Sequence, residues 1–270
     1  MAPFLLTIIK FSQIGNDDGA GGGPQGGRAD GRPEPVECRK CLFYYEEKTA
    51  LRVTGPTPPW GPSDAPGAPR RRSDTVEVPA DHSRIAPLPP TEWPDAMREA
   101  LAALRPPNPR HPFPTRDPGR PKGLNVLGML ARHPALAHAF NTFNGHVLFA
   151  TTLTARQREL LILRVAAVRQ AAYEWRQHVV LADDAGITPD EVARIAEGAG
   201  ATGWSLFERA LISAVDELLS DAKVTDETWE VLAAVLEVEQ LMDVVFTVGA
   251  YDLLAMAFRS FGVPLDDDLK

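Results

Sequence analysis

Residues 154–186 read TARQRELLILRVAAVRQAAYEWRQHVVLADDAG, a stretch in which Gly occurs only at the last position and Pro does not occur. Thr154, with Gln157 three residues later, has the pattern of a helix capping box, and Gly186 is a residue at which helices commonly end. We therefore expect helix through most of this stretch. Its first half, LLILRVAAV at residues 160–168, is apolar on every side, so a helix there must be covered all round by the core or by another subunit.

The second half of the stretch carries one stripe of residues at helical spacing, formed by Ala171, Glu174, Trp175, His178 and Ala182. Glu174 and His178 lie one turn apart in this stripe. An imidazole can accept and return a proton near neutral pH, and a carboxylate beside it fixes its tautomer and raises its basicity. The pair therefore suits proton transfer, although residues at this spacing are also typical of an ordinary surface ion pair.

Glu159 is a second acid that could join His178, but only if the chain reverses between them. In one straight helix the two residues would lie about 28 Å apart, at about 1.5 Å per residue. A turn near residues 169–171 would fold the second half back onto the first and bring them together. Without that turn, Glu159 would serve only the positive end of the helix dipole. Cooperation between Glu159 and His178 thus requires a helix, a turn and a second helix.

The charges of the chain are unevenly divided. Residues 122–270 hold 12 Lys and Arg against 21 Asp and Glu, a net charge of −9, whereas residues 1–121 hold 16 against 15. An acidic folded part is a poor surface for phosphate groups, so we expect neither a nucleic-acid partner nor an anionic-membrane partner.

The late apolar segment LMDVVFTVGAYDLLAMAF contains Asp243 and Asp252, which are costly in lipid, and is expected to be a buried helix. The start, MAPFLLTIIKF, lacks a basic region and a cleavage site, so we expect a cytoplasmic protein.

Composition divides the chain into three parts. Residues 1–85 are rich in Gly, Pro and Arg and are expected to be disordered. Cys38 and Cys41 in CRKC are the only cysteines; structural zinc needs four ligands and this segment offers two, so we expect no metal site and leave the role of the pair open. Residues 86–122 remain proline-rich, contain one short helix, and are expected to wrap the surface of a helical domain at residues 123–270.

This last domain is expected to be all-α, with about six to eight helices, because no segment alternates apolar and polar residues with period two. Pro134 is expected to divide its first helical region into a short and a longer helix. TPDEVARIAEG has Thr188 as its N-cap and Pro189 at the first helical position. The final helical region is expected to begin beside Thr225 and to end at Gly262.

Four segments, RELLILRVA, AYEWRQHVVLADDAGI, PDEVARIAEG and QLMDVVFTVGAYDLLAM, resemble the carboxymuconolactone decarboxylase family. The resemblance covers residues 90–265 in outline and implies the all-helical fold that this family shares with alkylhydroperoxidase D. Peroxidase members of the superfamily carry the pattern E-x11-C-x2-C-x3-H. Laid on this chain from Glu159, the pattern places Ala171 and Glu174 at the cysteines and His178 at the histidine.

This departure separates two activities. A thiol peroxidase needs one thiolate to attack the peroxide and a second thiol to resolve the sulfenic acid, and Ala171 and Glu174 supply neither. Peroxidase activity is therefore disfavoured. The decarboxylase branch, which has a histidine-centred site without the cysteine pair, resembles this chain better. The resemblance implies an acid/base enzyme of decarboxylase or isomerase type, without a cofactor, that acts on a small carboxylated or lactone-like metabolite.

The resemblance also assigns catalytic roles. His178 would be the general acid/base, and Glu174 would tune it or carry a second proton. Glu159 would orient the imidazole from behind. These three residues are our candidate catalytic group.

Further candidates concern substrate binding. Tyr173 or Trp175 would form a wall of the pocket. His146 is included because similar family members place the helix that corresponds to GHVLF beside the site. Arg164 and Arg176 could bind a substrate carboxylate, which arginine does with two parallel hydrogen bonds.

The alternative from another class is a non-catalytic helical oligomer that uses the same fold as an interaction module. Members of the family generally assemble as trimers or hexamers, and the all-round apolar helix agrees with such an assembly. We expect a homo-oligomer under either interpretation.

Overall fold

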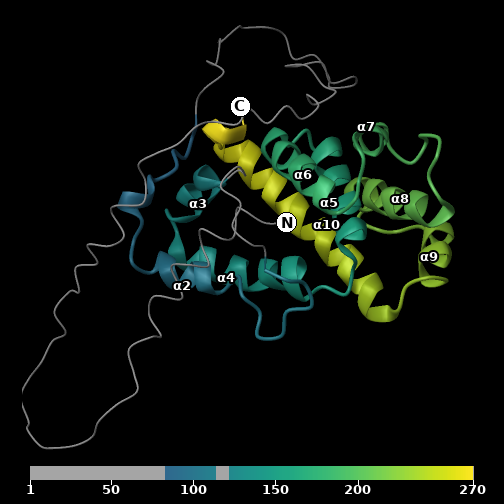
Figure 1. Cartoon of the computed structure of the whole chain (residues 1–270), viewed down its shortest axis with the longest axis horizontal. Helices are drawn as coiled ribbons and strands as arrows, with labels where there is room; N and C mark the ends of the chain where they lie inside the picture. Colours follow the sequence, from purple (N-terminus) through teal and green to yellow (C-terminus); the bar gives the residue numbers. More distant parts are fainter. Residues whose placement is uncertain (1–82, 114–121, 270) are drawn as a thin grey trace, which may run out of the picture.

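The structure, a computed structural model, describes residues 83–113 and 122–269 (Figure 1). Residues 1–82, which include Cys38 and Cys41 and nearly all of the extension predicted to be disordered, lie outside the described residues. All regular secondary structure in the described part is helical, as the sequence predicted. The α-helices are α2 (Met97–Ala102), α3 (Leu124–Leu130), α4 (Pro134–Gly145), α5 (Ala155–Val168), α6 (Ala172–Asp184), α7 (Pro189–Glu197), α8 (Leu206–Asp221), α9 (Asp226–Ala233) and α10 (Val238–Phe261), with short helical turns η2 (Pro90–Glu92), η3 (His146–Ala150) and η4 (Asp267–Leu269).

The helix ends follow the capping residues that the sequence predicted. Thr154 and Thr188 each accept a hydrogen bond from the backbone N–H three residues later, and the side chain at that later position bonds back to the cap, so both capping boxes are complete. Thr225 caps α9 with its side chain. Helix α10 ends at Gly262, whose φ of 66° is a left-handed conformation that glycine adopts without strain.

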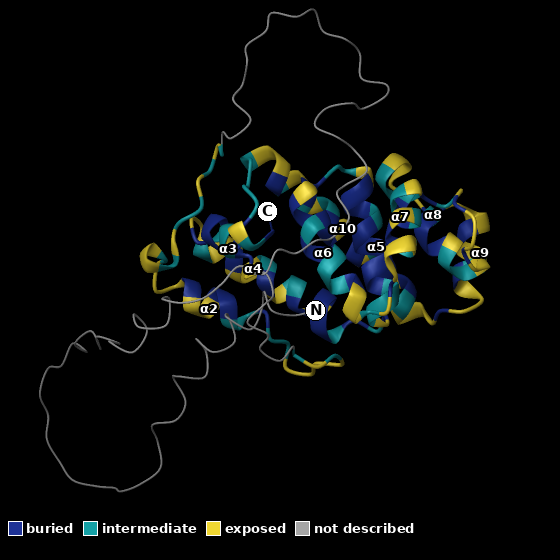
Figure 2. Cartoon of the chain, turned by 45° about the horizontal axis from the view of Figure 1, so that its top comes forward, coloured by how far each residue is buried: buried dark blue, intermediate teal, exposed yellow. Residues whose placement is uncertain are grey.

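Helix α5 is the centre of the domain and packs against α6, α7, α8 and α10. Its residues 158–163 and 165–167 are all buried, and Figure 2 shows most of the helix in dark blue. The all-round covering that the apolar sequence required is therefore provided within one chain. Arg158 and Glu159 are the two charged side chains in this buried surface of α5.

Helix α10 crosses α5 as a long diagonal rod (Figure 1). By length and composition alone it could cross a membrane, but half of its most apolar window is buried, and a core helix meets the same criterion. Its Asp243 accepts hydrogen bonds from the backbone N–H and hydroxyl of Thr152 at 2.6 and 2.7 Å, and lies 2.8 Å from Nε2 of His146. Burial alone would raise the pKa of Asp243, but these hydrogen bonds lower it. The carboxylate thus ties α10 to the segment that leads into α5.

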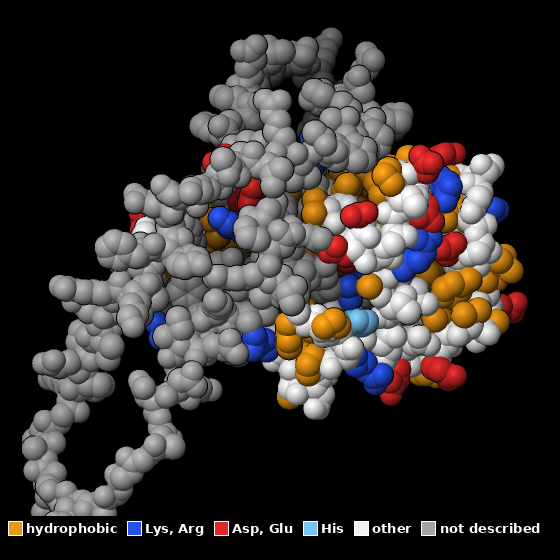
Figure 3. All heavy atoms as spheres, in the orientation of Figure 1, with side chains coloured by type: hydrophobic (Ala, Val, Ile, Leu, Met, Phe, Trp, Pro, Cys, Tyr) orange, Lys and Arg blue, Asp and Glu red, His pale blue; other side chains and the backbone are white. Residues whose placement is uncertain are grey.

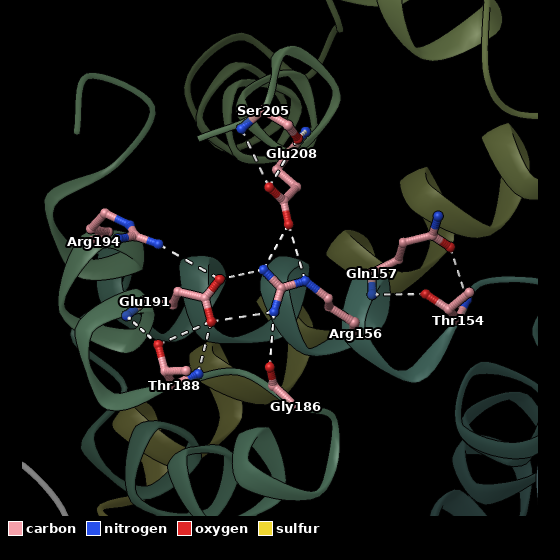
Figure 4. A network of polar contacts seen from close by, with 9 residues as sticks. All are labelled: Thr154, Arg156, Gln157, Gly186, Thr188, Glu191, Arg194, Ser205 and Glu208. Carbon is pink, nitrogen blue, oxygen red and sulfur yellow. Dashed lines mark hydrogen bonds and ion pairs between the residues drawn. The ribbon is translucent and has the colours of Figure 1, made fainter. Parts of the chain in front are cut away.

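A second polar junction joins α5 to α7 and α8 (Figure 4). Nη2 of Arg156 lies 2.5 Å from Oε1 of Glu191 and 2.7 Å from Oε1 of Glu208, and Nη1 donates to the carbonyl of Gly186 at 3.1 Å. The hydrogen bond from Arg156 is the main reason why the pKa of Glu191 is lowered to about 2. On the face seen in Figure 3, charged side chains of both signs lie interspersed on the right side of the molecule, where Figure 1 places α7 and α8.

The segment at residues 86–122 does more than wrap the surface. In its described part, Met97, Leu101 and Leu104 are buried in the same hydrophobic core as α5, and α2 packs against α4. The approach is close at Gly145, where an added Cβ would lie 2.7 Å from the carbonyl oxygen of Leu104. This segment therefore helps to build the domain around the site.

Candidate active site

The chain reverses between α5 and α6, as the sequence predicted for residues 169–171. Gln170 has a φ of 52°, in the left-handed region that residues with side chains seldom adopt. Arg169 fastens the turn to α10, because its guanidinium donates to Asp252 at 2.5 and 3.1 Å and its carbonyl accepts from Nη1 of Arg259 at 2.6 Å. The turn is thus stabilised by contacts with α10 in addition to the left-handed backbone conformation of Gln170.

This reversal brings Glu159 and His178 into contact. Nδ1 of His178 lies 2.7 Å from Oε2 of Glu159, and both residues are buried. The imidazole also makes an edge-to-face contact with Tyr251 of α10, with ring centroids 5.0 Å apart at 89°. The predicted meeting of Glu159 and His178 is confirmed, and the ring is held from α5 and α10 together.

Arg158 is a second charge beside Glu159. It is 1% exposed, its Nε lies 3.5 Å from Oε1 of Glu159, and its Nη1 donates to the carbonyl of Leu148 at 3.1 Å. Burial alone would raise the pKa of Glu159, but His178 and Arg158 outweigh it and lower that pKa below its ordinary value. Glu159 is therefore a carboxylate that accepts the N–H at Nδ1 of His178, which leaves Nε2 for a bound molecule.

A cavity of about 90 Å³ lies beside the imidazole, between α3, α4, α6 and α10. Most of its wall consists of Leu, Val and Phe side chains. Its polar lining is formed by Asn141, Asn144, Tyr173, Glu174, Gln177, His178 and Tyr251. A mostly apolar pocket with a few converging polar groups is typical of a small-molecule site.

Glu174 faces this cavity but is not the acid bonded to His178. It is 2% exposed, and neither of its carboxyl oxygens has a hydrogen-bond partner among the described residues. Burial raises the pKa of Glu174 well above 4.5, and the charge of Asp252 raises it further. The prediction that Glu174 tunes the imidazole is corrected, since Glu159 does so. Glu174 instead keeps its proton at pH values where an exposed glutamate has lost it.

Residues 134–217, which run from α4 through most of α8 and include Glu159, Glu174 and His178, match the family model described as "Carboxymuconolactone decarboxylase family". The chain contains a carboxymuconolactone decarboxylase family domain. No curated protein matches the sequence.

Solved structures show the fold around this carboxymuconolactone decarboxylase family domain. The chain is similar to the debrominase Bmp8 in complex with 2,3,4-tribromopyrrole, with 15% identity and a TM-score of 0.52 over 68% of this chain and 92% of that one. Apo Bmp8 gives 15% identity and 0.50 over 68% and 93%. An alkylhydroperoxidase AhpD core, a peroxidase-related protein from Ralstonia eutropha JMP134, has 19% identity and a TM-score of 0.49 over 54% and 78%. The predicted all-helical fold of the alkylhydroperoxidase D-like type is confirmed.

The peroxidase pattern of the superfamily can now be placed on the domain. Ala171 is the N-cap of α6, and Glu174 lies in the first turn of that helix. Neither residue contains sulfur, and the cysteines at positions 38 and 41 lie outside the described residues. The position of the second cysteine is thus occupied by the buried acid that lines the cavity.

The structure separates the two aromatic candidates. Tyr173 lines the cavity, and its hydroxyl donates to Oδ2 of Asp266 at 2.6 Å, which ties the pocket wall to the C-terminal segment. Trp175 is buried in the main hydrophobic core and does not line the cavity. Of the two alternatives, Tyr173 forms the pocket wall, whereas Trp175 lies two residues later, about 200° around the helix, and faces the core.

Three other candidates lie outside the cavity. His146 is half exposed and bonded to Asp243; Leu148, in the same short helix, reaches the cavity instead. Arg164 is engaged with Asp216 at 2.6 and 3.0 Å, and Arg176 is only partly buried. The prediction that these three residues bind substrate is therefore corrected.

Sequence reasoning missed the other polar residues of the site. Arg158 was not among the predicted site residues. With Glu159 it forms a charged pair inside an otherwise apolar helix, and such a pair is a signal that the sequence does contain. Tyr251 comes from α10, far along the chain, and Gln177 and Asn144 are amides with no motif around them. Among the described residues, no group of three or more His, Cys, Asp or Glu side chains is placed to hold a metal ion.

Proposed function

We propose that the carboxymuconolactone decarboxylase family domain is a cofactor-free enzyme that transfers a proton on a small organic molecule. The contact of 2.7 Å between Nδ1 of His178 and Glu159, at the wall of the cavity, is the observation that supports this proposal. An imidazole whose tautomer is fixed by a buried carboxylate is a common general base.

The chemistry follows from the two ring nitrogens. Ionised Glu159 holds the proton on Nδ1, so the lone pair of Nε2 can take a proton from a carbon next to a carbonyl group. The imidazolium that forms is stabilised by Glu159 and can return the proton to another carbon of the same substrate. The reaction type is therefore an isomerisation, or the protonation step that completes a decarboxylation.

The lining of the cavity favours an uncharged, lactone-like substrate over a carboxylated one. No Lys or Arg is present among the described residues that line it. A carboxylate would have to be buried beside the acid of Glu174 without a fixed cation, which is costly. We therefore narrow the substrate class to small carbonyl compounds without charge, and of the two reaction types we favour the isomerisation, because a decarboxylation needs a carboxylated substrate.

Peroxidase activity is not part of the proposal, because Ala171 and Glu174 carry no sulfur.

The proposal includes a homo-oligomer, trimeric or hexameric. Helix α10 exposes Val238, Met242, Phe246, Leu253 and Met256 along one side. A second copy would bury this apolar row. Sedimentation velocity should show the assembly and its loss in Phe246→Lys; a monomeric parent protein would exclude it. If the chemistry below fails, an interaction module built on this surface is the alternative function.

The decisive experiment follows deuterium incorporation from D2O into a panel of small lactones and cyclic enones by NMR. We expect exchange that falls by about 10²–10⁴-fold in His178→Asn, as for loss of a general base. His138→Asn is the matched control, because His138 is exposed on α4. Equal exchange by the parent protein and the folded His178→Asn variant would remove the enzyme proposal.

A further inference from the structure

The cavity wall holds polar atoms that the protein itself does not satisfy. Both carboxyl oxygens of Glu174, Nε2 of Gln177 and Oδ1 of Asn144 are buried without a hydrogen-bond partner in the described part of the chain. All three residues line the cavity beside His178. Buried polar atoms are nearly always paired, and a lost partner costs about 1–3 kcal/mol. Their convergence on one cavity indicates partners supplied by a bound molecule.

We infer that Glu174 and Gln177 form a pair of hydrogen-bond donors for the carbonyl oxygen of a small uncharged ligand, and that Asn144 accepts a hydrogen bond from a hydroxyl or amino group on it. Glu174 and Gln177 are three residues apart on α6, so their side chains emerge from one face of the helix. Asn144 comes from α4, on another wall of the cavity. This inference rests on the proposed function only in placing the ligand beside His178.

The surroundings of Glu174 explain why it acts as a donor. The titratable groups around it are Tyr173 and His178 of its own helix and Tyr251 and Asp252 of α10. Glu159 and Arg158 of α5 lie behind His178 and Tyr251. Helices α3 and α4 present only apolar and amide side chains to the cavity. No Lys or Arg lines the cavity among the described residues, and the guanidinium of Arg158 is engaged by Glu159 and the carbonyl of Leu148. The acid form of Glu174 is therefore favoured, and that form carries an O–H.

Gln177 is the natural second donor. Its amide lies beside the hydroxyl of Tyr173, which donates to Asp266 and can still accept a hydrogen bond from Gln177. An amide nitrogen carries two N–H groups, so Gln177 has an N–H left for a ligand even when the other points to Tyr173. An amide N–H and a carboxyl O–H can both donate to one carbonyl oxygen, which has two lone pairs.

The size of the cavity limits the ligand. Its volume of about 90 Å³ is smaller than the cavity of about 150 Å³ that holds benzene in a well-studied protein. A single five-membered ring with a carbonyl group is therefore a ligand of suitable size. Such a ligand would place its carbonyl against Glu174 and Gln177 and a neighbouring C–H against His178.

This arrangement supplies the electrophilic group that proton abstraction requires. When Nε2 of His178 takes the proton, the C–H bonding pair becomes a carbon–carbon double bond and the carbonyl oxygen gains the negative charge. Hydrogen bonds from Glu174 and Gln177 strengthen as that charge develops. The imidazolium then returns a proton to a carbon of the enolate, so atoms and charge balance without another reactant. Exchange of the imidazolium proton with solvent before this return is what introduces deuterium from D2O.

The test measures binding separately from turnover, with cyclopent-2-enone as the probe and ligand-detected NMR titration as the readout. Glu174→Leu removes the donor and should weaken binding about tenfold, whereas Glu174→Gln keeps an N–H donor and should stay within about threefold. Gln177→Leu should also weaken binding about tenfold. Equal affinity of the parent protein and Glu174→Leu would overturn the inference, and so would tighter binding of cyclopent-1-enecarboxylate than of the enone.

The acceptor role of Asn144 is tested separately, with a probe that carries a hydroxyl group. We expect 4-hydroxycyclopent-2-enone to bind more tightly than cyclopent-2-enone, and the advantage to disappear in Asn144→Leu. An advantage that persists in this variant would overturn the role of Asn144.

The outcomes also separate this inference from the proposed function. Binding with the expected Glu174 and Gln177 dependence but without deuterium exchange would retain the binding site and remove the enzyme. Exchange that depends on His178 but not on Glu174 or Gln177 would retain the enzyme and overturn the donor pair.

Discussion

The acids at the junction around Arg156 and the acid in the cavity beside His178 lie in opposite environments. At the junction, Glu191 and Glu208 both accept hydrogen bonds from one guanidinium, and the pKa of each is lowered. In the cavity, Glu174 has no hydrogen-bond partner and its pKa is raised. Both regions adjoin the central helix α5, because Arg156 belongs to the junction and Glu159 contacts His178 at the cavity wall.

The difference indicates what each region is for. A carboxylate paired with Arg adds to the free energy of unfolding, whereas a buried acid without a partner subtracts from it. Proteins retain such a cost mainly where a ligand or a reaction needs the group. Glu159 stands between the two cases, because it is fully buried and paired, but its partner is the imidazole that faces the cavity.

Removing Glu159 should have the largest effect on stability. Glu159→Ala leaves Arg158 buried without its counter-charge and His178 without its anchor. We expect a loss of about 3–5 kcal/mol in the free energy of unfolding, measured by urea titration with circular dichroism. Glu230→Ala, on an exposed face of α9, is the control and should change it by less than about 0.5 kcal/mol. A loss below about 1 kcal/mol for Glu159→Ala would show that the buried pair does not hold α5 to α6.

Breaking the junction should have a smaller effect. Arg156→Met keeps the aliphatic stem but leaves two acids without their cation, and about 1–2 kcal/mol of stability should be lost, because the group is partly exposed. Arg209→Met, an exposed arginine of α8, serves as the matched control. Should both variants behave alike, the network would contribute nothing measurable.

The stability difference between the parent protein and Arg156→Met should also depend on pH in the acidic range. The folded pKa of Glu191, about 2, lies below its ordinary value of 4.5. The stabilisation is thus fully present above pH 4.5 and is lost as the pH falls towards 2. The penalty of Arg156→Met should therefore shrink over that interval.

The same comparison shows which parts of the structure local sequence could predict. The caps at Thr154 and Thr188, the turn after α5 and the meeting of Glu159 with His178 all follow from signals within a few dozen residues. Helical spacing fixes which side chains share a face, and the requirement that Glu159 reach His178 placed the reversal near residues 169–171. These are the features that the structure confirmed.

The cavity lining could not be predicted in the same way, because it is assembled from four helices that meet only in the fold. Arg164 illustrates the error. It lies five residues after Glu159, about 140° around α5, and so it faces Asp216 of α8 rather than the cavity. Tyr251 was missed for the converse reason, since nothing near it in the sequence marks its approach to His178.

The subtlest prediction concerns Glu174 itself. Glu174→Gln replaces an acid that is costly to ionise with an uncharged group of the same shape, so at pH 7 it should stabilise the protein by on the order of 1 kcal/mol. The folded pKa of Glu174 is raised, which means that between its ordinary value of 4.5 and that higher value the unfolded chain releases a proton that the folded chain retains. The stability of the parent protein must fall with rising pH in this interval, and the advantage of the variant must grow.

As the pH falls towards 4, the acid becomes protonated in the unfolded state as well, and the advantage should shrink. Thermal unfolding followed by circular dichroism from pH 4 to 8 measures the difference. Glu227→Gln is the control, because Glu227 also lies in the first turn of a helix but is exposed. An advantage that is constant with pH would mean that Glu174 ionises as easily as an exposed glutamate. The contrast between the cavity and the Arg156 junction would then rest on hydrogen bonding alone, and Glu174 would meet a ligand as a carboxylate instead of a donor.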